Sequence, residues 1–156
     1  MKNKKQVGEA LGRVPSGLFV VTAKFEDKED AVLASWVNQC SFDPPGVTVS
    51  LGQMRNARLL IESSQAFIVN ILGQESKNLM KHFFKSHEGS IFEGLKTRKG
   101  IEGIQILTDA VSFLECSLAD VVTSGDHLVY FGEVVGGGVL KGGEPSIHVR
   151  DNGFSY

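Results

Sequence analysis

The pattern of apolar and polar residues along the chain predicts mostly β-strands. Residues 47–51 alternate strictly between apolar and polar side chains, which is typical of a strand with one buried face. The stretch 18–25 is almost continuously apolar and predicts a more deeply buried strand. Comparable patterns predict further strands at 31–37, 66–72, 111–119, 127–135 and 147–149.

A 3.6-residue period predicts three short helices, at 4–14, 56–62 and 76–85. Ser76 is the expected N-cap of the third helix. We expect that helix to bury Leu79, Met80, Phe83 and Phe84.

Turn residues separate these segments. In Asp43-Pro44-Pro45-Gly46 each proline favours extended geometry in the residue before it, and Gly46 suits a type II turn. Charged residues at 26–30 and Ser124-Gly125-Asp126 mark two further connections. The glycines at 136–143 are interpreted as hairpin turns.

Short strands with so few helices do not form a regular βαβ alternation. The pattern favours a mainly β fold, an antiparallel barrel with helices packed outside it. The 156 residues are enough for one domain with a core, so we expect residues 1–156 to form a single domain.

Composition and charge limit the expected partners and cellular location of the protein. A net charge of −2 and a pI near 6.1 do not favour nucleic-acid binding. The basic N-terminus is not followed by an apolar run, so no signal peptide is expected, and no apolar stretch approaches the roughly 18 residues of a membrane span. Cys40 and Cys116 lie far apart and are expected to be free thiols in a reducing compartment, with cytoplasm as the default. We expect Cys40 to be a small buried residue.

Several chemistries are disfavoured by their missing motifs. The glycine cluster is not a GxGxxG fingerprint between a strand and a helix, and no GxSxG elbow is present. His82 and His87 have unsuitable spacing for metal ligands, so no metal site is expected.

The run 34–58 remains as the candidate site. Ser35, Asn38, Gln39 and Ser41 offer polar groups for a heterocycle, and the start of the 56–62 helix, beside Arg55 and Asn56, is suited to an anion. A nucleotide-like cofactor would use both parts. A polar loop followed by solvated arginines explains the same residues.

The chain resembles the flavin reductase-like domains of the FMN-binding split-barrel fold, especially the C-terminal module of cyanobacterial diflavin (flavodiiron) flavoproteins. The matching segments are ALGRVPSGLFVVTA (10–23), LASWVNQCSFDPPGVTVSL (33–51), FIVNIL (67–72), LMKHFFK (79–85), ILTDAVSFLEC (106–116) and GDHLVYFGEVV (125–135). The chain departs from the commoner reductases at Leu33, which lacks the hydroxyl of that family position.

The resemblance implies bound FMN, NADH or NADPH as hydride donor, hydride transfer from nicotinamide C4 to flavin N5, and a homodimer. It implies that His127 positions the nicotinamide. It places six residues at the edge of the flavin ring: Ser35, Trp36, Val37, Asn38, Cys40 and Ser41. It places four near the ribityl chain and phosphate: Ser50, Gln53, Arg55 and Asn56. It also implies that Lys81 and Phe83 border the flavin.

Three functions follow as expectations. The first is an NAD(P)H:flavin oxidoreductase, with a possible protein acceptor. The second is an FMN-binding electron carrier reduced by a partner protein. The third is a split-barrel binding or dimerisation module without flavin. The flavodiiron segments are missing here, and Met1 slightly favours a stand-alone relative over an excised module.

Overall fold

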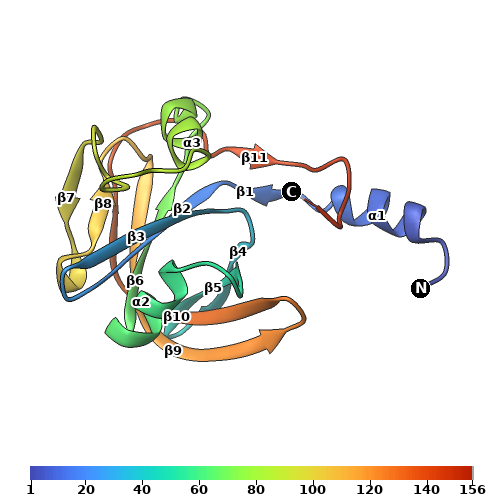
Figure 1. Ribbon diagram of the computed structural model, residues 1–156, viewed down its shortest axis with the longest axis horizontal. Helices are drawn as coiled ribbons and strands as arrows, with labels where there is room; N and C mark the ends of the chain where they lie inside the picture. The colour runs from blue at the N-terminus through green and yellow to red at the C-terminus, as the bar shows by residue number, and fades with distance from the viewer. Residues whose placement is uncertain (156) are drawn as a thin grey trace.

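Within residues 1–155, which the computed structural model describes, seven antiparallel strands form one sheet in the order β3-β2-β6-β9-β10-β5-β4. Two small sheets, β1-β11 and β7-β8, flank it (Figure 1). The elements are α1 (Lys4–Gly12), β1 (Ser16–Gly17), β2 (Phe19–Phe25), β3 (Lys28–Ala34), β4 (Val37–Phe42), β5 (Pro45–Gly52), α2 (Ala57–Ser64), β6 (Ala66–Ile71), α3 (Lys77–Phe83), β7 (Thr97–Lys99), the 3₁₀ helix η1 (Ile101–Gly103), β8 (Gln105–Leu107), β9 (Ser112–Ser124), β10 (His127–Val139) and β11 (Ile147–His148).

The two edge strands of this sheet, β3 and β4, are consecutive in the chain. Only Ser35 and Trp36 separate the end of β3 from the start of β4, so the sheet must curl until its edges meet. The Ser50 backbone N–H donates to the Trp36 carbonyl at 2.9 Å and ties this joint to β5. We call Ser35 and Trp36 the seam. The curled sheet confirms the predicted antiparallel split barrel.

The sheet bends along strands β9 and β10. They pair along their whole length, with register shifts between Phe131 and Gly132 and between Val134 and Gly136. Such bulges bend a strand and increase its twist. A side chain at Gly132 would lie 2.5 Å from the Phe67 ring, so the bend depends on glycine there. β10 lies between β9 and β5 and pairs with both.

The barrel interior is a continuous apolar cluster. Val21, Val49, Phe67 and Tyr130 are among its most buried members, and α2 contributes Ala57 and Ile61. A second cluster, which includes Leu79 and Phe92, lies where α3 covers the sheet. The alternation of the strand sequences therefore reflects which face of each strand points into the barrel.

The three predicted helices are present as α1, α2 and α3, and the predicted strands are present with shifted ends. The returning strand β3 ends at Ala34, three residues earlier than predicted. The β9–β10 turn at 125–126 is where the sequence placed it.

The turn at the prolines differs from the prediction. The connection is Asp43-Pro44, joined by a cis peptide bond, and Pro45 and Gly46 already belong to β5. Gly46 pairs with Ser41 and Glu133, so it has extended rather than positive-φ geometry.

The structure also differs from the predictions for the glycine cluster and for the third helix. Gly136, Gly137 and Gly138 lie inside β10, because β10 continues four residues beyond its predicted end to pair with β9. Ser76 is the N-cap residue of α3, as predicted, but its hydroxyl makes no capping bond to the helix: it accepts from the Gly73 backbone N–H and donates to the Asp109 carbonyl. Phe84 is exposed, since α3 ends at Phe83.

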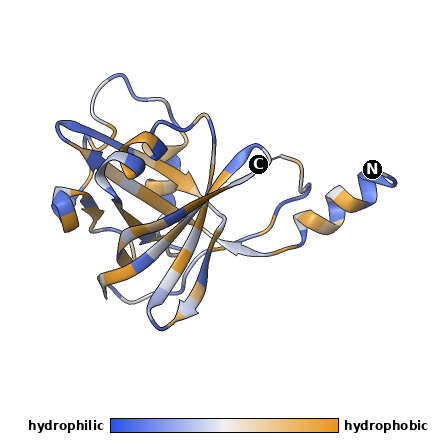
Figure 2. Ribbon diagram, turned by 90° about the horizontal axis from the view of Figure 1, so that it is seen from below, coloured by the Kyte–Doolittle hydropathy of each residue, from blue (hydrophilic) through white to orange (hydrophobic). Residues whose placement is uncertain are grey.

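Helix α1 projects from the barrel beside the C-terminal segment (Figure 1). The Gly8 carbonyl accepts from the Gly153 N–H at 2.8 Å, and the Gly12 carbonyl accepts from the Arg150 N–H at 3.0 Å. Hydrophobic positions remain on this helix although it lies outside the barrel (Figure 2), and Leu11 is exposed. We call α1 with residues 149–154 the arm.

No helix within residues 1–155 is both long and apolar enough to cross a membrane.

Candidate functional site

The seam carries a buried hydroxyl with no partner. Ser35 is 6% exposed, and its Oγ is the one buried side-chain nitrogen or oxygen within residues 1–155 that lacks a hydrogen bond. Buried polar atoms in native proteins are nearly always paired, because an unmade hydrogen bond costs about 1–3 kcal/mol. A ligand that bonds Ser35 Oγ would remove this cost.

Two side chains from distant parts of the sequence, His127 and Arg150, contact Trp36. The Trp36 and His127 ring centroids lie 4.8 Å apart, with the planes tilted by 49°. The Arg150 guanidinium lies 5.1 Å from the Trp36 centroid, within cation–π range. The pairing of β5 with β10, which sets His127 opposite Gly52, brings the histidine to the seam. Trp36 and His127 were predicted to belong to one site, and their rings are in contact.

Asp126 orients the histidine. Its carboxylate is 2.7 Å from His127 Nδ1. This hydrogen bond, aided by the charge of the imidazolium when it is protonated, lowers the pKa of Asp126. An ionised Asp126 favours a proton on Nδ1, so the imidazole presents Nε2 to whatever lies beside it.

Gln53 is engaged with the turn that precedes His127. Its backbone N–H donates to the Asp126 carbonyl at 3.1 Å, and its side-chain Nε2 donates to the Gly125 carbonyl at 2.9 Å. Ser50, the residue that bonds Trp36, pairs with Val129 on β10. Ser50 therefore contacts the seam directly, and Gln53 contacts the turn that precedes His127.

The carboxylate of Asp30 lies at the start of α2, where an anion was expected to bind. Asp30, on β3, accepts a hydrogen bond from the Ala31 backbone N–H at 2.8 Å. Burial raises the pKa of Asp30, and the backbone N–H groups of Ala31 and Ala57, the first residue of α2, act in the opposite direction together with the charge of Arg55. Arg55 and Asn56 are exposed. An anion at this helix start would meet the Arg55 cation and the Asp30 carboxylate together.

The outer part of the predicted ring edge lies on the β4–β5 hairpin. Val37 is buried in the barrel cluster, so it can reach a ligand only through its backbone. Asn38 is exposed and Ser41 is half-buried. The expectation that Cys40 is buried is wrong: it is an exposed free thiol at the position where the β4–β5 register shifts.

Helix α3 borders a hollow of about 310 Å³. Leu18, which precedes β2, also lines it, whereas the seam residues Ser35 and Trp36 do not. From α3 the lining side chains are Lys77 and Met80. Lys81 is exposed, and Phe83 packs in the second core cluster.

Sequence reasoning missed three residues of this region: Arg150, Asp126 and Asp30. Arg150 follows a two-residue strand, and no spacing links it to Trp36. Asp126 was assigned only to a turn, although an acidic residue beside His127 is a usable signal. Asp30 was assigned to a charged connection. For a metal, no group of three or more His, Cys, Asp or Glu side chains with ligand geometry occurs within residues 1–155.

These residues fit a flavin. An isoalloxazine ring has a flat apolar face and an edge of hydrogen-bonding atoms, and the seam offers aromatic side chains, a buried unpaired hydroxyl and nearby cations.

The comparisons with known proteins agree with this fit. Residues 11–154 match the family model of the flavin reductase like domain, so the chain belongs to that family. It is 38% identical over 152 residues to diflavin flavoprotein A 1 of a Synechocystis species, covering 95% of this chain and 26% of that protein. The chain thus spans about a quarter of the length of the curated relatives it matches.

Solved structures show the same fold. Nitrilotriacetate monooxygenase component B from Mycobacterium thermoresistibile superposes with a TM-score of 0.86 at 26% identity, covering 96% of this chain and 84% of that one. The flavin reductase HpaC, solved with NADP+, gives a TM-score of 0.78 at 25% identity over 93% of this chain and 90% of its own. The chain is thus a member of the flavin reductase like domain family with the split-barrel fold.

Proposed function

We propose that this domain binds FMN at the seam and acts as an NAD(P)H:flavin oxidoreductase. The observation that best supports this proposal is the buried, unpartnered Ser35 Oγ beside the Trp36–His127 contact. When bound, the flavin supplies the redox chemistry, accepting at N5 the hydride that nicotinamide releases from C4.

The chain's own residues would bind and orient. Ser35 Oγ, with Asn38 and Ser41, would hydrogen-bond the polar edge of the ring. Ser50 would face the ribityl chain. Arg55 and Asn56 would hold the phosphate, with the positive charge of Arg55 as the main attraction. His127, oriented by Asp126, would orient the nicotinamide by hydrogen bonding.

FMN rather than FAD is proposed because the run 34–58 offers one anion position. Binding titrations with riboflavin, FMN and FAD test the choice. Tight binding of FMN and weak binding of riboflavin would support it, whereas FAD binding well above FMN would contradict it.

Activity is the direct test. Purified full chain with FMN should oxidise NADH or NADPH faster than free FMN does. Turnover no faster than free FMN would reject the reductase proposal. Comparing the two nucleotides in one assay identifies the donor.

The proposed assembly is a homodimer of single-domain chains. Val14, Ile147 and Val149 are exposed by 60%, 76% and 57%, and the pairing of β1 with β11 gathers them near the base of the arm. Exposed apolar residues gathered in one area favour an interface over a solvated surface.

A second candidate is an electron carrier that receives electrons from a protein partner. Met54, which follows the end of β5 and neighbours the Gln53 that bonds the 125–126 turn, is 94% exposed, which suits a docking surface on the His127 side of the seam. Stopped-flow reduction separates the two functions. Rapid reduction of bound FMN by NAD(P)H alone favours the reductase, and reduction that requires a partner reductase favours the carrier.

A further inference from the structure

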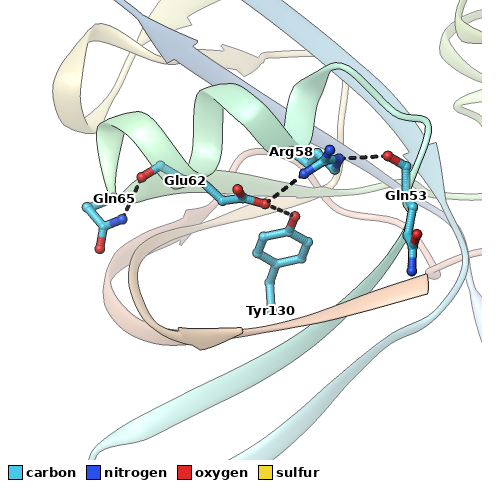
Figure 3. Close-up of polar contacts among 5 residues, drawn as sticks. All are labelled: Gln53, Arg58, Glu62, Gln65 and Tyr130. Carbon is cyan, nitrogen blue, oxygen red and sulfur yellow. Dashed lines mark hydrogen bonds and ion pairs between the residues drawn. The ribbon is translucent and has the colours of Figure 1, made fainter. Parts of the chain in front are cut away.

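A chain of polar contacts runs from Tyr130 in the barrel core to Gln53 (Figure 3), and Gln53 bonds the turn that precedes His127. Tyr130, fully buried, donates its hydroxyl to Glu62 Oε1 at 2.7 Å. Arg58 lies 3.3 Å from the same oxygen and donates from Nε to the Gln53 carbonyl at 2.7 Å. Figure 3 shows the Glu62 carboxylate between the Arg58 and Tyr130 side chains.

Gln53 is the last member of this chain and the first to touch the turn. Its backbone N–H and its side-chain amide both donate to the turn, to the Asp126 and Gly125 carbonyls. Gly125 has a φ of 61°, and a side chain there would meet nothing within 4 Å. The turn therefore has open space around Gly125, and the hydrogen bonds to Gln53 add to the His127–Gly52 pairing in fixing its position relative to β5.

The position of this turn determines the position of the His127 ring. Asp126 contacts His127 Nδ1, and the His127 side chain is only 14% exposed while its ring lies on Trp36. A shift of the 125–126 backbone would move both the carboxylate and the ring. Neither Arg58 nor Glu62 has a contact with the seam that would give it a direct role.

We propose that Gln53 and Arg58, anchored through Glu62 to the buried Tyr130, are positioning residues that hold His127 against Trp36 in the geometry the nicotinamide requires. This inference rests on the proposed function. It assigns Gln53 to the turn, because its amide is already bonded to Gly125 rather than available to a ribityl chain.

Arginine at position 58 suits this role in a way that lysine does not. A half-exposed i,i+4 ion pair with Glu62 alone contributes little. The planar guanidinium, however, bonds the Gln53 carbonyl and the Glu62 carboxylate from different nitrogens. Burial and the bond to Glu62 raise the pKa of Tyr130, so the phenol remains a neutral donor at the end of the chain.

Trp36 provides a readout independent of turnover, because it is the only tryptophan. A protonated imidazole in contact with an indole quenches its fluorescence. Emission of the full chain, without and with FMN, is compared between about pH 8 and pH 5.5, the range in which imidazoles ionise. His127→Asn identifies the part of the change that belongs to His127.

The variants are Gln53→Met and Arg58→Met, with Gln65→Met as the matched control. Gln65 is an exposed glutamine at the other end of α2, and its amide donates to the Glu62 carbonyl (Figure 3). We expect Gln53→Met and Arg58→Met to lose at least half of the His127-dependent quenching and Gln65→Met to retain it. Arg58→Lys should restore little of it. Full quenching in both test variants overturns the proposal.

Kinetics give the second measurement. Loss of one or two hydrogen bonds should raise KM for NAD(P)H about three- to tenfold in Gln53→Met while the Kd for FMN stays within about twofold. A weakened FMN Kd with an unchanged KM would return Gln53 to the ribityl site and reject the positioning role. If the parent chain has no turnover, the proposed function fails, and the fluorescence comparison still decides whether these residues hold His127.

Discussion

The two cysteines differ sharply in environment. Cys40 is exposed on an edge strand, whereas Cys116 is fully buried between β6 and β10. Burial, with the Glu115 carboxylate adding to it, raises the pKa of the Cys116 thiol to about 12. Because the thiolate is the reactive form, Cys116 should be inert in the folded chain.

Thiol titration with an aromatic disulfide reagent at about pH 8 should therefore detect one reactive thiol per native chain and two after denaturation. Cys40→Ser should remove the native signal, and Cys116→Ala should leave it unchanged. Equal reaction of both thiols in the native chain would show that β9 opens readily at Cys116.

The same shift predicts a loss of stability in alkali. The folded pKa of Cys116, about 12, exceeds that of an unfolded thiol, about 8.5, so the unfolded chain releases its proton first. The stabilising contribution is complete below about pH 8.5 and declines as pH rises toward 12. Between about pH 9 and 10 the free energy of unfolding should fall about 1.4 kcal/mol more steeply in the parent chain than in Cys116→Ala, as measured by urea denaturation. Parallel slopes would contradict this.

Asp30 allows a test of where the phosphate lies. Its carboxylate occupies the first turn of α2 beside Arg55 and would repel an arriving phosphate. Asp30→Asn keeps an oxygen acceptor for Ala57 and removes the charge. If the phosphate binds at this helix start, FMN should bind about fivefold tighter to Asp30→Asn, while riboflavin, which lacks the phosphate, is unaffected. An equal response of both flavins would place the phosphate elsewhere.

At the scale of elements, the arm depends on a close backbone approach. A side chain at Gly12 would lie 2.4 Å from the Arg150 carbonyl oxygen. Alanine favours a helix over glycine by about 1 kcal/mol, so Gly12→Ala should keep α1 helical while separating it from the C-terminal segment. Limited proteolysis should then cut within 149–154 severalfold faster, and Trp36 emission should change as Arg150 moves away.

Gly142→Ala is the control for this variant, because a side chain there meets nothing within 4 Å. Cleavage rates that match in the two variants would mean that the arm tolerates a Cβ at Gly12.

Local pattern was enough to predict most elements, and it failed where tertiary pairing decided the outcome. The alternation at 47–51 gave β5 its correct faces. Gly136 to Gly138 read as turns because glycine is rare in strands, yet β9 pairs with them. Pro45 begins β5 at a position where the edge strand β4 ends. Neither pairing leaves a local signal.

The candidate site shows the same division. Ser35 and Trp36 were found through their neighbours in the sequence and through family resemblance. Their contacts with His127 and Arg150 come from segments about 90 and 110 residues away, brought together by the β5–β10 pairing and by the arm. The role of Gln53 could not be predicted, since its amide serves a backbone carbonyl that any turn sequence would provide.

At the scale of the whole molecule, association should depend on the base of the arm. Val14→Glu combined with Ile147→Glu should convert the proposed homodimer to monomers in light scattering, because two buried charges would oppose the interface. Leu59→Glu, a similarly exposed apolar residue on α2, is the control and should leave the mass unchanged. A monomeric parent chain would reject the homodimer.

The joining of β3 to β4 by two residues also bears on solubility. An open sheet of this size presents two edges, and each unpaired edge is a template for another chain's strand. Here the unpaired edges of β3 and β4 both begin at the same short joint. A cofactor seated at that joint would cover the place where the two edges come together, and the empty domain should aggregate sooner than the loaded one.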